Sequence, residues 1–219
     1  MGVTDQQGQT LAVALAAAAL VDDGMVVGLG TGSTIELLLP ALAERGLSIR
    51  CVATSPRTEE AARALGIEIE PFEHVERLDI AIDGADQVAP DGWVVKGGGA
   101  AHTREKLIGS AADRFVVIVD GSKLVEAIGP PIPLELMAFG LASVLRALGP
   151  SAVRDVPRSP DGGVIADYLG PVRDPAALAA RFDSTPGVVE HGLFPPQMVS
   201  EVLIGRADGS VERRPVSGA

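Results

Sequence analysis

The stretch Met25-Val26-Val27-Gly28-Leu29-Gly30-Thr31-Gly32-Ser33-Thr34 takes the chain from a buried strand through a tight turn into a helix. Its first five residues form an apolar run of the length typical of a strand inside a parallel sheet. The following helix is predicted to run to Gly46, with a disturbance at Pro40. A strand that passes directly into a helix is the repeating unit of a parallel α/β sheet.

The same alternation continues along the chain on both sides of this stretch. Further helices are expected at 5–21, 58–65 and 100–112, and further strands at 48–53, 67–69, 78–82, 93–96 and 115–119. Short glycine-bearing loops connect them. We therefore predict an α/β fold with a Rossmann-like, mostly parallel sheet and helices on both faces.

The segment Gly129-Pro130-Pro131-Ile132-Pro133 is rigid and indicates a domain boundary. After it, the stretch 134–148 is predicted to begin as a strand and to continue as a helix, and prolines and glycines then recur between short segments. We predict a Rossmann-like catalytic domain at 1–130, to which the chain returns at 203–219. A smaller α+β domain is expected at 131–202.

Composition excludes several classes of protein. The formal net charge of −11 over 219 residues argues against nucleic acid as a partner, because phosphates require a basic face. The single cysteine, Cys51, lies in an apolar run and is interpreted as a buried strand residue rather than a reactive thiol. The three histidines, His74, His102 and His191, are scattered, so no metal site is predicted.

The apolar run from Leu11 to Val21 is too short to cross a bilayer, and no basic residue precedes it. Its alanines fit a buried helix better than a membrane or signal segment. No membrane partner is expected, and the chain is predicted to be cytoplasmic.

The stretch from Asp83 to Lys106, DGADQVAPDGWVVKGGGAAHTREK, gathers the groups that proton chemistry requires. It contains carboxylates, an amine and three consecutive glycines, which let the backbone approach a ligand closely. Of the 18 basic residues in the chain only three are lysines: Lys96, Lys106 and Lys123. A lysine is a compact charge with a tunable pKa, so these positions are candidates for chemistry.

The candidate residues follow predicted strands. In a parallel α/β sheet, ligands bind beyond the carboxyl ends of the strands, so loops distant in sequence are expected to converge there. These loops hold Thr31 to Thr34, Asp83 and Asp86, Lys96 to Gly99, and Lys123.

Each motif alone has a structural alternative. The 31–34 turn could be an empty, well-capped helix start, and its spacing matches neither the dinucleotide fingerprint nor the Walker sequence. Asp83-Gly84-Ala85-Asp86 could be an ordinary turn. Glu105 could merely stabilise a helix near its positive end, and Lys123 could be a surface lysine.

The combination of motifs resembles ribose-5-phosphate isomerase of the A type. The matching segments are GLGTGST at 28–34, TSPRT at 54–58, DGAD at 83–86, KGGGAAHTREK at 96–106, GSK at 121–123 and GLF at 192–194. The resemblance implies interconversion of ribose 5-phosphate and ribulose 5-phosphate through an enediolate, in the non-oxidative pentose phosphate pathway. It implies no metal and no cofactor, and a homodimer or homotetramer.

The resemblance also implies roles for particular residues. Glu105 would be the base that moves a proton between C2 and C1, and Lys96 would stabilise the developing oxyanion. Asp83 and Asp86 would handle hydroxyl protons and ring opening, with the division between them open. The implied substrate contacts are Thr31, Gly32, Ser33, Thr34, Asp83, Gly84, Ala85, Asp86, Lys96, Gly97, Gly98, Gly99 and Lys123.

One departure from the family pattern concerns the phosphate. Members of the family can carry a phosphate-binding lysine on the first helix, whereas nothing before Arg45 is basic here. Two other functions stay open. A sugar-phosphate sensor would carry a DNA-binding segment and would not need Glu105. An acyl or coenzyme A transferase would form a covalent intermediate on that glutamate.

Overall fold

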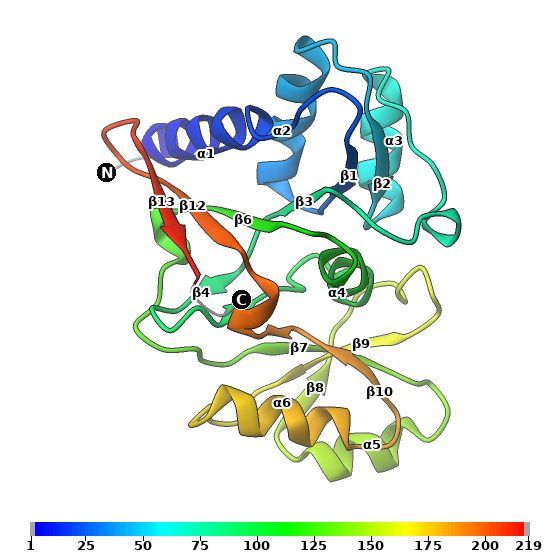
Figure 1. The fold of residues 1–219 in the computed structure, drawn as a ribbon. Helices are drawn as coiled ribbons and strands as arrows, with labels where there is room; N and C mark the ends of the chain where they lie inside the picture. The colour runs from blue at the N-terminus through cyan, green and yellow to red at the C-terminus, as the bar shows by residue number, and fades with distance from the viewer. Residues whose placement is uncertain (1–2, 217–219) are drawn as a thin grey trace.

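Three β-sheets form the fold, and the largest of them is mostly parallel (Figure 1). The structure is a computed structural model that describes residues 3–216. The central sheet has the strand order β13-β12-β6-β3-β1-β2, in which only β13 is antiparallel to its neighbour. Its strands are β1 (Val26–Leu29), β2 (Arg50–Ala53), β3 (Ile80–Asp83), β6 (Phe115–Asp120), β12 (Glu201–Gly205) and β13 (Val211–Pro215).

Helices cover both faces of the central sheet, as predicted. Alternate side chains of each strand point to opposite faces. In β6, Val116 and Ile118 pack in one core cluster with α1 (Val3–Ala18), α2 (Ser33–Glu44) and Ala62 of α3 (Pro56–Ala64). Val117 and Val119 of the same strand pack in a second cluster with Ile108 of α4 (His102–Ser110). The sheet thus places α4 on the face opposite α1 and α2.

The apolar run at 11–21 lies largely in α1, where Val13, Ala14 and Ala17 are fully buried. Among the described residues, no helix is both long and apolar enough to traverse a bilayer. Cys51 is also fully buried in β2, and burial raises the pKa of its thiol to about 12. The interpretation of Cys51 as a buried strand residue is confirmed.

Two smaller antiparallel sheets follow. A four-stranded sheet has the order β10-β7-β9-β8, and a three-stranded sheet has the order β11-β5-β4. Helices α5 and α6 pack with the four-stranded sheet in a third core cluster (Figure 1). The elements are β4 (Gln87–Val88), β5 (Val94–Val95), β7 (Ile132–Leu136), α5 (Leu141–Leu148), β8 (Ser151–Val153), β9 (Val164–Tyr168), α6 (Pro175–Asp183), β10 (Val188–His191) and β11 (Leu193–Phe194), with short 3₁₀ turns at Phe72–His74, Gly121–Lys123 and Pro196–Met198.

The chain returns to the central sheet through β12, which pairs with β6. The division into a domain of 1–130 plus 203–219 and a domain of 131–202 stays a proposal. Residues 1–2 and 217–219 of that division lie outside the described residues.

Most expected elements differ from the structure by a few residues at their ends, and three differ more. The strand expected at 67–69 is reduced to one bridge between Ile69 and Cys51, after which the chain turns away at Pro71. The helix expected at 100–112 is shorter, at His102–Ser110. The strand expected at 93–96 contains only Val94–Val95 and belongs to the three-stranded sheet, because it pairs with β4 and β11. Pro40 lies inside α2, which continues to Glu44.

Gly30 is required for the close approach of β1 and β3. A Cβ atom at this position would lie 1.9 Å from Oδ1 of Asp83. We expect Gly30→Ala to destabilise the protein by about 1–3 kcal/mol, because a fixed backbone cannot clear the clash. Urea unfolding measures this loss. Gly8→Ala is the control: nothing lies within 4 Å of its added Cβ, so it should stabilise α1 by roughly 0.5–1 kcal/mol. Equal effects of the two substitutions would refute the expected clash.

Candidate active site

A cleft of about 120 Å³ opens where four parts of the chain meet. These are the turn after β1, the loop after β3, the loop after β5 with the start of α4, and the turn after β6. The cleft is lined by Thr31, Gly32, Ser33, Thr34, Gly84, Ala85, Asp86, Lys96, Gly97, Gly98, Gly99, Glu105 and Lys123. The structure therefore brings together the expected substrate-contact residues, with Asp83 buried in contact with Lys96. Lys106, also a candidate from the sequence, lies outside the cleft and pairs with Glu190.

A buried lysine lies between two buried carboxylates in this cleft. Lys96 Nζ is 2.8 Å from Asp83 Oδ2 and 3.2 Å from Glu105 Oε2, and it donates a hydrogen bond of 2.6 Å to the carbonyl of Gly84. The three side chains are only 2–3% exposed. Burying one cation with two anions leaves an excess negative charge, which favours protonation of one carboxyl group.

Glu105 is the group that takes up this proton. Burial raises the pKa of Glu105 to about 8, and repulsion from Asp83 adds to the shift while Lys96 opposes it. Burial also raises the pKa of Asp83, but Lys96 and the backbone N–H groups of Thr31 and Gly84 oppose that shift. Burial alone would lower the pKa of Lys96, but its two carboxylate partners raise it. Lys96 and Asp83 are therefore the ion pair, and Glu105 is mostly neutral at pH 7.

Asp86 lies on the exposed wall of the cleft, held by the glycine loop, which we define as Gly97–Gly99. The N–H of Gly98 donates to Asp86 Oδ2 at 2.7 Å. A Cβ at Gly98 would lie 2.5 Å from Asp86 Oδ1, so a larger residue there would displace this carboxylate. Asp86 thus presents a carboxylate to the cleft from a fixed position.

The turn at 30–34 is supported by the TSPRT segment, for which the sequence alone indicated no structural role. The hydroxyls of Thr31 and Thr54 are 2.7 Å apart, and Thr58 donates a hydrogen bond of 2.8 Å to the carbonyl of Gly30. The side chain of Ser55 caps α3 by accepting from the N–H of Thr58. These hydrogen bonds hold the turn in place. The turn leads into the first residues of α2, which line the cleft.

Gln6 and Gln9 of α1 reach the turn after β6. Gln6 donates to Asp120 Oδ2 at 3.2 Å, and Gln9 accepts from the N–H of Gly121 at 3.3 Å. Arg45 instead binds the carbonyls of Ala18 and Val21 at the end of α1. The first helix therefore contributes amides beside the turn that carries Lys123.

A buried glutamate outside the cleft supports α4. Glu135 of β7 is 2% exposed and accepts a hydrogen bond of 2.5 Å from Thr103 at the start of α4. Its other oxygen accepts from Ser159. This contact could not be predicted from the sequence, because the three residues come from separate elements of the chain. It fixes the helix that carries Glu105.

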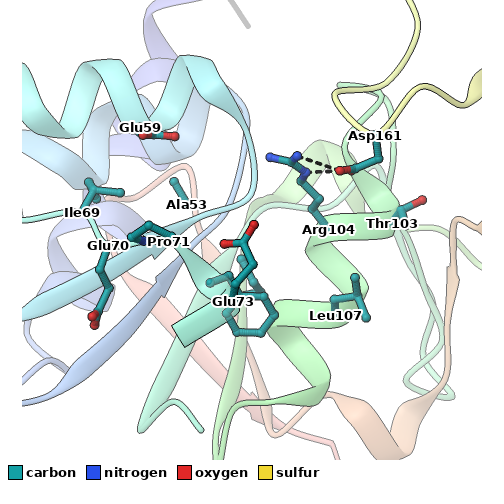
Figure 2. A pocket seen from close by; sticks show the side chains of 12 residues that line it. Ala53, Glu59, Ile69, Glu70, Pro71, Glu73, Thr103, Arg104, Leu107 and Asp161 are labelled. Carbon is teal, nitrogen blue, oxygen red and sulfur yellow. Dashed lines mark hydrogen bonds and ion pairs between the residues drawn. The ribbon is translucent and has the colours of Figure 1, made fainter. Parts of the chain in front are cut away.

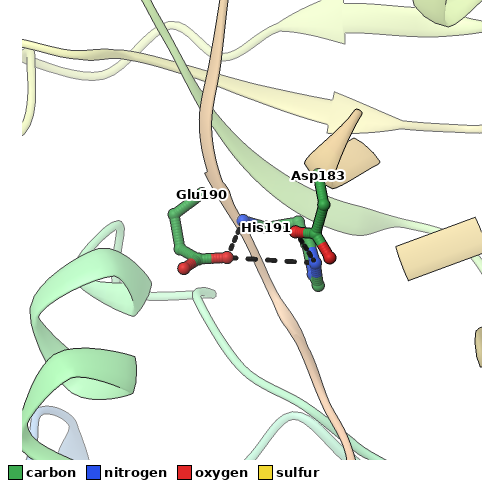
Figure 3. A group of neighbouring side chains, drawn as sticks. All are labelled: Asp183, Glu190 and His191. Carbon is green, nitrogen blue, oxygen red and sulfur yellow. Dashed lines mark hydrogen bonds and ion pairs between the residues drawn. The ribbon is translucent and has the colours of Figure 1, made fainter. Parts of the chain in front are cut away.

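A second group of titratable residues lies apart from the cleft. In the described part of the chain, Asp183, Glu190 and His191 are the one trio with potential metal-ligand atoms within 4.8 Å of one another (Figure 3). Lys106 Nζ lies 2.6 Å from Glu190 Oε1 and 3.3 Å from His191 Nδ1. Nδ1 also accepts from the N–H of Leu193, so Nε2 carries the hydrogen that faces Asp183. An ammonium and a donating imidazole do not suit a cation.

A larger groove, of about 710 Å³, lies on another side of α4. Figure 2 shows Arg104 of this helix paired with Asp161 through two bonds of 2.7 Å. The other charged residues that line it are Glu59, Glu70 and Glu73. Its only cation is already paired with a carboxylate, so the groove does not suit an anionic ligand. The smaller cleft is therefore the candidate site.

Comparison with known proteins agrees with this geometry. The family described as "Ribose 5-phosphate isomerase A (phosphoriboisomerase A)" matches residues 50–209. A curated ribose-5-phosphate isomerase A from Caulobacter vibrioides is 45% identical over 216 residues, which cover 91% of this chain and 95% of the relative. The chain belongs to the ribose 5-phosphate isomerase A family.

Solved structures of the ribose 5-phosphate isomerase A family share the whole fold. The enzyme from Neisseria gonorrhoeae superposes with a TM-score of 0.92 at 30% identity, covering 97% of this chain and 98% of the other. A D-ribose-5-phosphate isomerase solved in complex with phospho-erythronic acid gives a TM-score of 0.90 at 31% identity, covering 98% and 100%. The predicted fold class is confirmed.

The proton on Glu105 can be measured directly. We expect Lys96→Met to raise the pKa of Glu105 further above 8, because it removes the cation that stabilises the carboxylate. Titration of the glutamate carboxyl carbons by NMR gives this value. Lys123→Met, which removes a cation from the rim of the same cleft, should change it much less. An unchanged pKa in Lys96→Met would disprove the assigned coupling.

Proposed function

We propose that this chain interconverts D-ribose 5-phosphate and D-ribulose 5-phosphate, in the non-oxidative pentose phosphate pathway, without metal or cofactor. The observation that carries the proposal is the buried Lys96 between Asp83 and Glu105, at the wall of a cleft lined by a helix-opening turn. Membership of the ribose 5-phosphate isomerase A family supports the same reaction.

Glu105 is the base of this reaction. Its carboxylate removes the hydrogen from C2 of the open-chain aldose, the electron pair of that bond forms the C1–C2 double bond, and the C1 carbonyl oxygen becomes an oxyanion. Lys96, 3.2 Å from Glu105, stabilises that negative charge. Glu105 then returns the proton to C1, and transfer of the O2 hydroxyl proton to O1 completes the ketose.

The two aspartates have different surroundings, which supports different roles. Asp83 is buried, and its oxygens face Lys96 and the N–H groups of Thr31 and Gly84. We propose that Asp83 orients Lys96 and stabilises its positive charge. Asp86 is exposed in the cleft, so it is the carboxylate placed to exchange hydroxyl protons and to open the sugar ring.

We assign the phosphate of the substrate to the 31–34 turn and Lys123, which also line the cleft. The turn from Thr31 to Thr34 opens α2, where free N–H groups, hydroxyls and the helix dipole attract an anion. Lys123, on the turn after β6, lines the same cleft. With a net charge of −11, the molecule needs this local positive site to capture a dianion.

The alternative functions fit these surroundings less well. A sensor has no use for a buried glutamate with a raised pKa, whereas a general base requires one. Membership of the ribose 5-phosphate isomerase A family favours proton transfer by Glu105 over covalent transfer. By resemblance to the family, we further propose a cytoplasmic homodimer or homotetramer that binds neither nucleic acid nor membrane.

Glu105→Gln should lower turnover at least roughly 100-fold while leaving ligand binding largely intact. The substitution preserves the shape of the neutral acid and removes the base. Because the ionised form is the active one, kcat/KM of the unaltered protein should rise with pH, by about tenfold per unit, and level off near the pKa of about 8.

A coupled assay with ribose 5-phosphate across pH 6 to 9 measures both effects. Glu59→Gln is the matched control and should retain full activity, because Glu59 is a half-buried glutamate that pairs with Arg63 on α3, outside the cleft. A Glu105→Gln protein with near-normal turnover would remove Glu105 from the mechanism.

Lys123→Ala should weaken binding of ribose 5-phosphate about 10- to 100-fold, since a charge-assisted hydrogen bond contributes about 1.5–3 kcal/mol. Binding of unphosphorylated ribose should change little. Lys123→Arg should restore only part of the affinity, because a planar fork does not replace a compact ammonium. Calorimetry with both ligands distinguishes the roles: an equal loss for the two sugars would place Lys123 at the sugar instead.

A further inference from the structure

The glycine loop is held from behind by an arginine of the four-stranded sheet. Arg154, which directly follows β8, donates from Nη1 to the carbonyl of Gly97 at 2.8 Å and to that of Gly98 at 3.3 Å. It does not line the cleft. Arg154 is not among the candidate residues predicted from the sequence.

The guanidinium has a fixed direction. Its Nε and Nη2 bind the two carboxylate oxygens of Asp167 in β9, at 2.7 Å and 2.5 Å. Both side chains are 17% exposed, and the N–H of Arg154 also pairs with the carbonyl of Ile165 in β9. Because the fork is planar and two of its donors are engaged by one carboxylate, the remaining nitrogen is aimed at the loop.

This contact determines where the loop's N–H groups point. In a planar trans peptide the C=O and the N–H point in opposite directions. The Gly97 carbonyl faces Arg154, and the N–H of the same peptide, that of Gly98, faces Asp86 at 2.7 Å. The Gly98 carbonyl also faces Arg154, so the N–H of Gly99 points away from it, and Gly99 lines the cleft.

We propose that Arg154 is a positioning residue for substrate binding. It orients two successive peptides so that Asp86 is fixed by the first and the Gly99 N–H is available to a sugar oxygen from the second. A turn bond of 3.0 Å from the Ala100 N–H to the Gly97 carbonyl closes the loop. Three glycines have little conformational preference of their own, so the contact with Arg154 restricts the loop further. The proposal rests on the proposed isomerase activity for its ligand, but the orientation of the loop is independent of it.

Arg154→Ala should raise KM for ribose 5-phosphate about tenfold, because misplaced binding groups weaken substrate binding, with a smaller fall in kcat through the loosened Asp86, while Lys96 and Glu105 stay unaltered. The pH at which kcat/KM levels off should stay the same. Free guanidinium chloride at low millimolar concentration should restore KM in this variant, and sodium chloride at the same concentration should not. A merely structural role would lower the active fraction, which reduces kcat and leaves KM unchanged.

Amide hydrogen exchange tests the orientation without any reaction. The N–H of Gly98 should exchange faster in Arg154→Ala and, to a smaller extent, in Asp167→Asn, which frees the guanidinium. Arg146→Ala is the matched control, because this exposed arginine lies on α5 and lines no pocket with the glycine loop. It should leave both exchange and KM unchanged.

The results of these experiments test the isomerase activity and the positioning role of Arg154 separately. An unaltered protein that lacks isomerase activity would refute the proposed function, and the exchange of Gly98 would still decide the role of Arg154. Unchanged exchange in Arg154→Ala, or a loss of kcat at constant KM, would overturn the positioning role. Faster exchange together with a raised KM that guanidinium restores would establish it.

Discussion

The placement of one buried ammonium between two buried carboxylates is the constraint on which the rest of this structure depends. Lys96, Asp83 and Glu105 are each almost inaccessible to water, where an unpaired charge is expensive and electrostatic interactions are strong. The two carboxyl groups, of Asp83 and Glu105, have different surroundings and therefore different roles. Asp83 accepts from two backbone N–H groups and lies 2.8 Å from Lys96 Nζ, whereas Glu105 lies 3.2 Å from it and its pKa is raised to about 8.

The fold holds these three side chains in place through close contacts between its strands, loops and helix α4. The missing side chain at Gly30 lets Asp83 approach β1, and the missing side chain at Gly98 lets Asp86 approach the glycine loop. Helix α4 is held on both sides: Ile108 packs on the central sheet, and Thr103 bonds to Glu135 of the four-stranded sheet. A base on a helix fixed at both sides needs little rearrangement when substrate arrives.

The central sheet and the cleft residues could be predicted from the sequence because their signals are local. Strand, turn and helix follow one another at 25–46, and the clustered carboxylates and glycines mark the rim. The three-stranded sheet could not be predicted, since its strands have two residues each and Leu193–Phe194 pairs with Val94–Val95 across almost a hundred positions. Likewise Glu135 and Arg154 acquire their roles only from tertiary contacts with the loop and helix they hold.

The central claim is that a carboxylic acid of this cleft carries a proton between two carbons of the sugar. Isomerisation of ribose 5-phosphate in deuterium oxide, followed by NMR of the ribulose 5-phosphate formed, tests it most directly. The proton on Glu105 can exchange with solvent between its removal from C2 and its return to C1, so deuterium should appear at C1 of the ketose. A product with no carbon-bound deuterium after extensive turnover would indicate direct transfer of hydrogen between the carbons and would contradict the account.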